Sequence, residues 1–527
     1  MIKKVRYLEL KDLEEYFEFE PTNPIIGLVM HNHWFIKSFN EKSIYFGYWI
    51  EINNSAYKLI SDIEISEEIK EIEVVNNREV NIITDSSRIK IYLDEEGLNI
   101  TSINPIFISI FLDCRKLYSN ADEGNIYRVI PDSNKYYINF KQEFEKYELN
   151  FFIYYEGNLR FINDLKQIEF DYDLKRNSAF YRFKILKGFE GYITKLKIFS
   201  ENKNKILPIV SNTENPFKKF ILDRILSLYN PDNGFKAGLP WFPQRWFRDE
   251  LWTLLFLEKN SLEDLSLKEN ILEFYLNNLE KIYEKNKEND YIQAADTFLL
   301  IVNNLDDIKL IENADKLKEI LSNWEQTFNL NNLPAKSTWM DTLNRKRAIE
   351  IDFLFYSALK KLKLENKALE FKTILKSHIF TKSYPKEELY SPNLFLAYFI
   401  SKDFFEEFEW FNFFDIIIEK YYLNWGGFST KEKDSENFYK KHTGEDPSSY
   451  HSGDSWFWIN NIGAYVLYNL SYRKYEKYIE KIKEASIINI LKMGVLGYSS
   501  ELSSAENLKY EGSLIQLWSL SSFYLLI

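Results

Sequence analysis

The amino-terminal part of the chain alternates apolar and polar residues, which is the pattern of strands with one buried face. The clearest runs are residues 43–52, 88–93, 136–140, 147–155 and 192–199. Turn signals such as Glu95-Glu96-Gly97 separate these runs. Because many short strands follow one another without helices between them, we predict an antiparallel β-sandwich over residues 1–205.

From residue 216 onward the period changes, and apolar residues recur at every third or fourth position. Phe217, Phe220, Ile221, Ile225 and Leu228 show this spacing. About twelve such segments follow one another, with centres near residues 223, 254, 273, 297, 319, 355, 371, 396, 414, 461, 482 and 518. Twelve helices predict an (α/α)6 barrel, a double ring of helices, over residues 216–527. An α-solenoid is the alternative, but no fixed repeat period is visible.

The two patterns meet at residues 201–215, a polar stretch that contains Pro208. We take this stretch as the domain boundary. The predicted fold class is therefore α+β multidomain, with the β-sandwich first and the barrel second. In such a barrel, loops at one end of the inner ring form a pocket, and the most polar and aromatic loops of this chain fall between helical segments.

The composition limits the possible partners. Hydrophobic residues make up 45% and aromatic residues 17% of the 527 residues, which excludes a disordered protein. The formal net charge of -12 argues against nucleic acid and against anionic membranes, and it favours a neutral substrate. The most apolar run lies at the carboxyl terminus and is too short to span a bilayer. The first twenty residues lack the apolar core of a secretory signal, so we expect a cytoplasmic protein.

Cysteine and histidine give little sign of a metal or redox site. Cys114 is the single cysteine, so the chain can form no internal disulfide and has no CxxC zinc motif. His31 and His33 would point to one side of a strand, as metal ligands could, but no carboxylate pattern completes a ligand set. We expect no metal and no cofactor.

Residues 238–251, GLPWFPQRWFRDEL, combine tryptophans with an Arg248-Asp249 pair at the start of a helical pattern. Aromatic rings stack on the C–H face of a sugar, and a rigid charged pair binds its hydroxyls. The alternative interpretation is a loop-to-helix junction with tryptophan in the core and a salt bridge on the surface.

Two further carboxylates, Asp341 and Glu501, are candidates for catalysis. Each lies in a predicted loop before a helix, with Trp339 or Tyr498 close by in sequence. Glycoside hydrolysis requires one carboxylic acid to protonate the leaving oxygen and one carboxylate to activate water. Asp296 also opens a helical run, where it could equally be an N-terminal capping residue.

The helical half resembles the glucosidase domain of glycogen debranching enzymes, the amylo-alpha-1,6-glucosidase family. Six motifs carry the resemblance in the family's order. They are Gly238-Leu-Pro-Trp-Phe242 with Arg248-Asp249, Ala295-Asp296, Thr338-Trp-Met-Asp341 with Arg347-Ala-Ile-Glu350-Ile, Ser391-Pro392-Asn393, Tyr450-His451-Ser-Gly453 with Trp456, and Ser500-Glu501 with Gly512 and Gln516-Leu-Trp518-Ser519.

The resemblance implies an (α/α)6 barrel and an inverting, exo-acting glucosidase that removes α-1,6-linked glucose from glycogen-like glucan. It implies that Asp341 is the general acid and that Glu501 is the general base. The other implied roles concern the substrate: Arg248, Asp249 and Asp296 bind glucose hydroxyls, Trp241, Trp339 and His451 line the pocket, and Glu350 is a carboxylate of the pocket wall or of the layer behind it.

The sequence departs from the family's pattern at three places. Residues 243–247 replace a turn that often contains glycine, the charged loop 342–346 also lacks glycine, and Ser391 stands where arginine is common. The first departure keeps open another inverting hydrolase, such as a glucoamylase or trehalase. A non-catalytic glucan-binding module is a further alternative. The chain is too short for the additional (β/α)8 glucanotransferase domain of bifunctional debranching enzymes, so we expect glucosidase action without transferase.

Overall fold

The computed structural model describes residues 2–119, 124–144, 146–201, 213–259, 265–282, 295–327 and 338–527. The chain divides into two compact units. The first unit comprises Met1–Gln244, Ile487–Ser500 and Ser513–Ile515, and the second comprises Arg245–Ser486, Glu501–Gly512 and Gln516–Ile527. Most of the predicted boundary, residues 202–212, lies outside the described residues.

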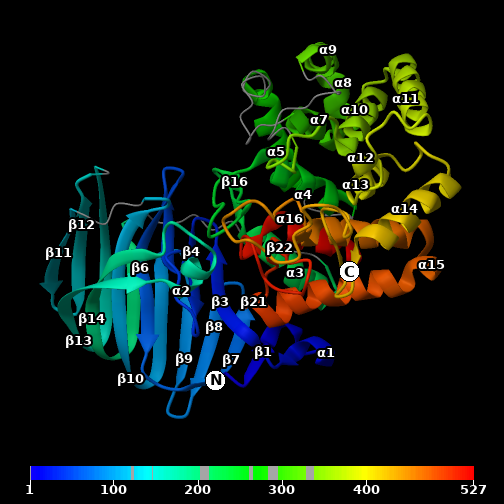
Figure 1. Ribbon diagram of the computed structural model, residues 1–527. Coiled ribbons are helices and arrows are strands. Elements are labelled where there is room, and N and C mark those ends of the chain that lie inside the picture. The colour runs from blue at the N-terminus through cyan, green and yellow to red at the C-terminus, as the bar shows by residue number, and fades with distance from the viewer. Residues whose placement is uncertain are drawn as a thin grey trace. The chain divides into compact units, whose positions relative to one another are not determined.

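Strands β1 to β14 and β21 of the first unit join into one curled, mostly antiparallel sheet (Figure 1). Its main path has the order β2-β1-β7-β8-β9-β10-β6-β5-β4-β3-β21, and β11 to β14 branch from β10. The strands are β1 (Lys4–Tyr7), β2 (Glu18–Phe19), β3 (Thr22–Met30), β4 (His33–Ser38), β5 (Gly47–Ile52), β6 (Ser55–Ile65), β7 (Ile69–Asn76), β8 (Glu79–Thr84), β9 (Arg88–Leu93), β10 (Gly97–Lys116), β11 (Asn125–Asp132), β12 (Lys135–Gln142), β13 (Tyr147–Glu169), β14 (Arg182–Ser200) and β21 (Met493–Val495).

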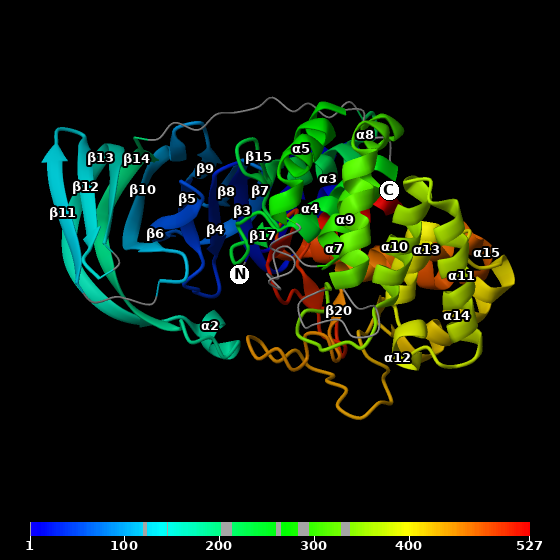
Figure 2. The ribbon, with the colours of Figure 1, turned by 90° about the horizontal axis from the view of Figure 1, so that it is seen from above.

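Strand β10 connects the parts of this sheet. Its first half pairs with β9, its second half pairs with β6, and β14 runs along most of its length. The register shifts between Thr101 and Ile106 and again after Ile110. Such irregularities let a long strand bend. The predicted β character of this region is thus confirmed, as one curled sheet whose outer strands are seen from above in Figure 2, and its description as a sandwich stays a prediction.

The alternation in the sequence identifies the buried face of several strands correctly. In β9, Ile89, Ile91 and Leu93 are buried, and in β12, Ile138 and Phe140 are buried. The predicted strand over residues 43–52 is too long at its start, because β5 begins only at Gly47.

The physical reason lies in Asp173, which accepts hydrogen bonds from Ser43 Oγ and from the Ile44 amide at 2.9 and 2.7 Å. These bonds hold the segment before β5 as a loop. The same unit contains the short helices α1 (Glu14–Phe17) and α2 (Asp171–Lys175). It also contains α3 (Pro216–Ser227), which begins with a proline after the capping residue Asn215.

The second unit is helical, and each of the twelve predicted segment centres falls within a helix, the first of them in α3 of the first unit. The kink in α15 at Ser471 separates two predicted segments. The helices are α4 (Phe247–Lys259), α5 (Leu265–Asn277), α7 (Ala295–Asn304), α8 (Asp307–Glu312), α9 (Ala314–Thr327), α10 (Ile349–Lys361), α11 (Glu365–Phe380), α12 (Lys386–Leu389), α13 (Asn393–Ser401), α14 (Glu407–Tyr421), α15 (Phe457–Lys492) and α16 (Leu517–Phe523).

Six of these helices pack in a closed cyclic order, α4-α7-α10-α13-α15-α16 and back to α4. Asn304 of α7 donates to Leu251 O of α4 at 3.0 Å, and Asn303 donates to Leu354 O of α10 at 3.1 Å. Helix α10 packs on α13. Gly463 of α15 faces Phe395 of α13, and Asn461 of α15 donates to Ser519 O of α16. Thr253 of α4 shares a hydrogen bond with Ser521 of α16, which closes the order.

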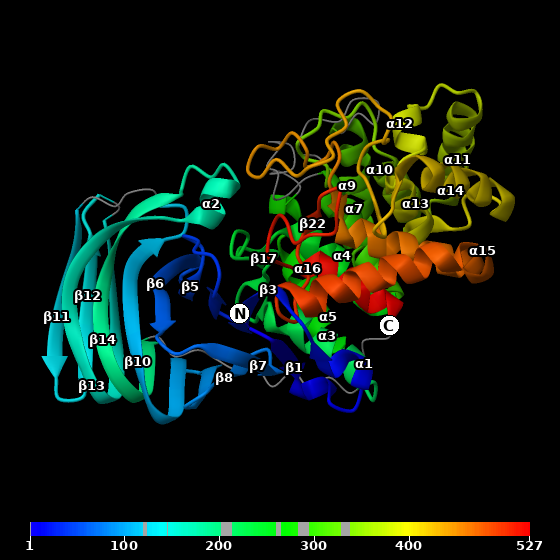
Figure 3. The same cartoon turned by 60° about the horizontal axis from the view of Figure 1, so that its bottom comes forward.

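Aromatic side chains fill the interior of this six-helix ring. Trp252 of α4 contacts both Phe399 of α13 and Trp458 of α15, which are not its neighbours in the cyclic order. Phe256, one turn further along α4, also contacts Phe399. Helices α15 and α16 of this ring are labelled in Figure 3. Side chains of helices that are not neighbours in the ring therefore meet in its interior.

Over the described ranges, no helix is both long enough and apolar enough to cross a bilayer.

A buried ion cluster offers a test of the sheet. Lys58 of β6 pairs with Asp113 of β10 at 2.6 Å, neither side chain is exposed, and Arg115 also donates to Asp113. Burial lowers the pKa of Lys58 to about 8, with the charge of Asp113 opposing it. Lys58→Met should cost about 3 kcal/mol of unfolding free energy, because Asp113 stays buried with one partner fewer. Urea unfolding of the full chain measures this loss.

The control for this prediction is Lys42→Met. Lys42 pairs with Glu64 at 2.6 Å, but both side chains are more than two-fifths exposed. Solvent screens such a pair, so its loss should cost less than about 1 kcal/mol. Equal destabilisation by the two substitutions would contradict the role given to the buried cluster.

Candidate active site

The six ring helices all place their amino-terminal turns at one end, where the sequence motifs lie. Arg248 in the first turn of α4 donates from Nε to Asp296 Oδ2, in the first turn of α7, at 2.5 Å. Both residues are buried. The predicted alternative of a surface salt bridge is therefore wrong for Arg248, because its partner comes from the neighbouring helix and both groups are out of solvent.

Asp249 lies beside Arg248 and is also buried. Gln516, just before α16, donates to Asp249 Oδ1 at 3.0 Å. Burial, with the negative charges of Glu501 and Asp341, raises the pKa of Asp249 to about 8, and the Arg248 cation opposes the rise. Asp249 is thus protonated at neutral pH. The same interactions show that Asp341 and Glu501 each lie within electrostatic reach of Asp249.

Glu501 is held by a tyrosine and a glycine. Tyr450 donates its hydroxyl to Glu501 Oε1 at 2.5 Å. Burial, followed by the charge of Glu501, raises the pKa of Tyr450 well above its usual range, so the hydroxyl keeps its proton. Gly512 has φ +67°, and a Cβ at this position would lie 2.3 Å from Glu501 Oε2. Only glycine leaves room for the carboxylate in this position.

The segment that carries Asp341 is held by its neighbours in sequence. Trp339 donates from its indole nitrogen to Asn393 Oδ1 at 3.0 Å. The ring of Trp339 meets Trp458 edge to face, with a centroid distance of 5.2 Å. Thr342 Oγ1 lies 2.7 Å from His451 Nδ1. These contacts bring together the start of α13, the start of α15 and the segment 338–342.

His451 is neutral. Its ring stacks on Trp456 with a centroid distance of 5.1 Å and an interplanar angle of 7°. Burial, together with the positive charges of Arg345 and Arg248, lowers the pKa of His451 well below its usual range. A neutral imidazole in this place can accept or donate a hydrogen bond at Nε2 according to its tautomer.

Several buried polar atoms at this end of the ring have no hydrogen-bond partner among the described residues. Buried polar groups are rarely left unpaired, because desolvation without a partner costs free energy. Their side chains are at least nine-tenths buried, and they include donors and acceptors from four helices, from one loop and from Gln516 just before α16. The atoms are Arg248 Nη2, Asp296 Oδ1, His451 Nε2, Trp458 Nε1, Gln516 Oε1 and Trp518 Nε1.

Glu350 and Trp241 have surroundings of their own. Both carboxylate oxygens of Glu350 accept hydrogen bonds from Arg345. Trp241 belongs to the first unit, where its ring meets Tyr45 edge to face and Arg176 stacks over it at 3.9 Å. The substrate-binding roles of these two residues stay predictions.

Tyr450, Gln516, Trp458 and Trp518 have no role among the predictions made from the sequence. Trp458 and Trp518 stack with a centroid distance of 4.5 Å and an interplanar angle of 7°. Tyr450, Gln516 and Trp518 belong to the motifs quoted above, so their membership in those motifs was the available signal. Tyr498, by contrast, was considered as the aromatic neighbour of Glu501, but its hydroxyl lies 3.1 Å from Ser227 Oγ.

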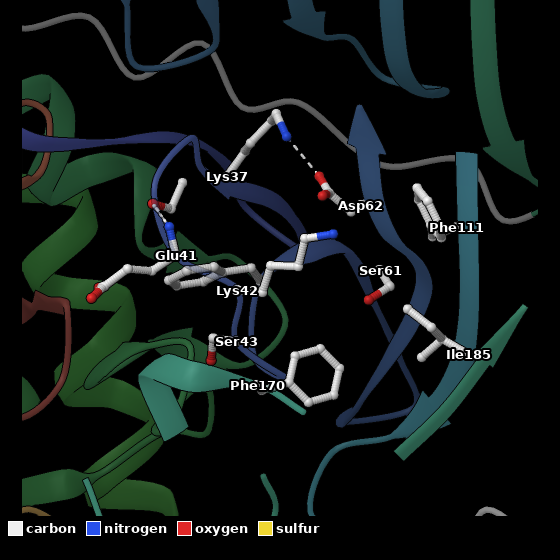
Figure 4. Close-up of a pocket in the computed structure, with 11 residues that line it drawn as sticks. Lys37, Glu41, Lys42, Ser43, Ser61, Asp62, Phe111, Phe170 and Ile185 are labelled. Carbon is white, nitrogen blue, oxygen red and sulfur yellow. Dashed lines mark hydrogen bonds and ion pairs between the residues drawn. The ribbon is translucent and has the colours of Figure 1, made fainter. Parts of the chain in front are cut away.

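The first unit offers weaker candidates. His31 Nδ1 lies 2.7 Å from Tyr229 O, and His33 Nδ1 lies 3.1 Å from Tyr48 Oη. Within the described residues no three potential ligands gather around a metal position. A cleft between β4 and β6 is lined by charged residues, but Lys37 is already paired with Asp62 at 2.6 Å (Figure 4).

Comparison with known proteins supports the resemblance for part of the chain. Residues 315–524 match the family model described as Amylo-alpha-1,6-glucosidase. The resemblance to this family is therefore confirmed for that segment, which contains both predicted catalytic carboxylates. Four of the predicted substrate-binding residues precede this segment, namely Trp241, Arg248, Asp249 and Asp296.

No curated protein matches the chain. Among solved structures, the chain is similar to one described as "Putative kojibiose phosphorylase from human microbiome". The sequence identity is 9% and the TM-score is 0.33, and the alignment covers 97% of this chain and 82% of the other.

The raised pKa of Asp249 gives a prediction for stability. Between about pH 4 and pH 8, folded Asp249 keeps a proton that the unfolded chain has released, since the ordinary pKa is 3.8. This group therefore makes the unfolding free energy fall as pH rises through that window, by at most about 1.4 kcal/mol per pH unit. Asp249→Asn should remove this part of the slope.

Urea unfolding of the wild type and of Asp249→Asn at several pH values measures the difference. The difference between the two proteins, rather than either curve alone, isolates Asp249 from the other titrating groups. Parallel curves across the window would show that Asp249 titrates near its ordinary pKa.

Proposed function

We propose that the protein is an inverting, exo-acting glycoside hydrolase that removes α-1,6-linked glucose from glycogen-like glucan. The observation that carries this proposal is the gathering of Asp341 and Glu501 around Asp249 at one end of the helical ring. Unpaired buried donors and acceptors surround them. A small, neutral molecule with many hydroxyl groups satisfies such atoms.

We further propose that the helical part is an (α/α)6 barrel. Its support is the closed order of six inner helices, each joined to the next by hydrogen bonds or packed side chains. Helices α5, α9, α11 and α14 lie between inner helices in the sequence, as the outer ring of such a barrel requires. The amino-terminal turns of the inner helices carry positive partial charge, which favours carboxylates there.

In the proposed reaction, the Asp341 carboxylic acid donates its proton to the bridging oxygen as the bond from that oxygen to C1 of glucose breaks. The Glu501 carboxylate takes a proton from water, whose oxygen bonds to C1 from the opposite face. Glucose with the β configuration leaves with the shortened glucan. Asp341 is then ionised and Glu501 protonated, and exchange with solvent restores both. The Tyr450 hydroxyl favours the ionised form of Glu501 before water attacks, because it donates a hydrogen bond to the carboxylate.

The other groups serve to hold the sugar. Arg248 and Asp296 present a free donor and a free acceptor from adjacent helices. Protonated Asp249 can donate a hydrogen bond, which an ionised aspartate cannot do. The stacked pair Trp458 and Trp518 offers two indole N–H groups. These groups together suit the hydroxyls of one terminal glucose.

Proton NMR of the wild type acting on a maltooligosaccharide with a single α-1,6 glucosyl branch tests this function. Initial release of β-glucose is the expected result, with linear maltooligosaccharide and trehalose left intact. Release of α-glucose would contradict inversion. Glucose from the linear chain or from trehalose would instead support a glucoamylase or trehalase, and binding without turnover of any substrate would support a glucan-binding module.

Asp341→Asn should lower turnover of the branched substrate about 10²- to 10⁴-fold, because an amide cannot protonate the leaving oxygen. Asp307→Asn, at an exposed position on α8, is the control and should behave as the wild type. Initial rates at saturating substrate, with circular dichroism to check the fold, measure the effect. Near-normal turnover by Asp341→Asn would remove Asp341 from the mechanism.

A further inference from the structure

Arg345 lies in the charged loop that follows Asp341, and its guanidinium makes an unusual number of contacts. Nε donates to Glu388 Oε1 at 2.8 Å, and Nη1 donates to Thr338 Oγ1 at 3.1 Å and to Glu350 Oε1 at 2.5 Å. Nη2 donates to Glu350 Oε2 at 2.9 Å and to Glu388 Oε2. All five guanidinium N–H donors are therefore used.

These contacts join three separate elements. Glu350 lies in the first turn of α10, Glu388 lies in α12, and Thr338 opens the Thr338–Asp341 motif. The contact with Thr338 closes the segment 338–345 on itself, and Asp341 lies at its middle. All four side chains of this cluster are buried.

The closed segment contains no helix or strand. Its shape therefore depends on side-chain contacts rather than on a backbone hydrogen-bond ladder. Asp341 is itself partly exposed, and Thr342 and Asn344 are exposed. Between Asp341 and the start of α10, Arg345 and Arg347 are the charged residues that are buried.

We propose that Arg345 is a positioning residue, which holds the segment of Asp341 in the geometry that proton donation requires. This inference rests on the proposed function, since it takes Asp341 as the general acid. Arg345 acts on the segment of Asp341 through its contacts with Thr338, Glu350 and Glu388. Glu350 has a structural part in this arrangement, because its carboxylate holds the Arg345 guanidinium to α10.

Arginine is required at this position for geometric reasons. Two carboxylates each receive two parallel N–H groups, which a planar guanidinium can supply and the ammonium of lysine cannot. Lysine at this position could reach one carboxylate but could not also hold Thr338. A misplacement of about 1 Å in a reacting group can lower the rate on the order of 100-fold.

Arg347 provides a matched control. Like Arg345 it is buried, and like Arg345 it pairs with the acidic residue five positions later, here Asp352, from Nε at 2.8 Å and Nη2 at 3.1 Å. Tyr384 also donates to Asp352, at 2.7 Å. The hydrogen bonds from Arg347 to Asp352 thus fix α10 to the segment before it.

The experiment compares Arg345→Met, Arg345→Lys and Arg347→Met in the full chain with two substrates. One substrate is the branched maltooligosaccharide, whose leaving oxygen needs a proton. The other is α-glucosyl fluoride, whose fluoride leaves with little need for one. Arg345→Met should lower kcat on the oligosaccharide on the order of 100-fold with little change in KM. Turnover of the fluoride should fall far less, and Arg345→Lys should restore only part of the loss.

Arg347→Met should leave the ratio of the two activities as in the wild type. Equal losses on both substrates in Arg345→Met, or equal losses in Arg345→Met and Arg347→Met, would overturn the proposal. If Arg345→Met does not fold, the variant Arg345→Met/Glu350→Gln/Glu388→Gln removes the unpaired buried charges, and it should show the same selective loss.

Hydrogen exchange of residues 338–348 separates this proposal from the proposed function. Arg345→Lys should speed exchange in this segment more than Arg347→Lys does. If the wild type hydrolyses neither substrate, the proposed function is wrong, while this measurement still tests whether Arg345 holds the segment 338–345. Unchanged exchange in Arg345→Lys would overturn the positioning role of Arg345 even in an active enzyme.

Discussion

Carboxylates buried close together repel one another, and this constraint shapes the end of the helical ring where the motifs meet. Asp341 and Glu501 each lie within electrostatic reach of Asp249, and Arg248 is a cation that faces Asp249, Asp296 and Asp341. Burial is the main reason that Asp249 keeps its proton at neutral pH, and the charges of Glu501 and Asp341 act in the same direction. The amino-terminal turns of the helices add positive partial charge.

The same constraint recurs one layer further out, where the solution is different. Arg345 and Arg347 each pair with the acid five residues later, and each lies before α10. There every guanidinium N–H group of Arg345 has an acceptor, and two carboxylates share its one positive charge. At the end of the ring the hydrogen bonding is left incomplete at Arg248, Asp296, His451 and Gln516, and in the proposed function these atoms bind the substrate. Completeness of hydrogen bonding thus distinguishes the Arg345 cluster from the proposed binding site.

Much of the architecture could be predicted from the spacing of apolar residues along the chain. Each predicted helical centre falls within a helix, and the alternation in β9 and β12 identifies their buried residues, because these patterns depend on residues a few positions apart. The start of β5 could not be predicted in this way. The alternating pattern continues back to Ser43, but Asp173, far along the chain, binds Ser43 and Ile44 and holds them as a loop.

The sequence alone determined the strand-forming region, the helical region that follows it and the order of the motifs. It also identified Asp341 and Glu501 as candidates for catalysis. Partnerships between distant residues were decided only by the tertiary structure. Arg248 meets Asp296, Tyr450 meets Glu501, and Gln516 meets Asp249 because six helices close into a ring that brings their first turns together. Local sequence sets where each helix begins, but the closure of the ring sets which side chains can reach one another.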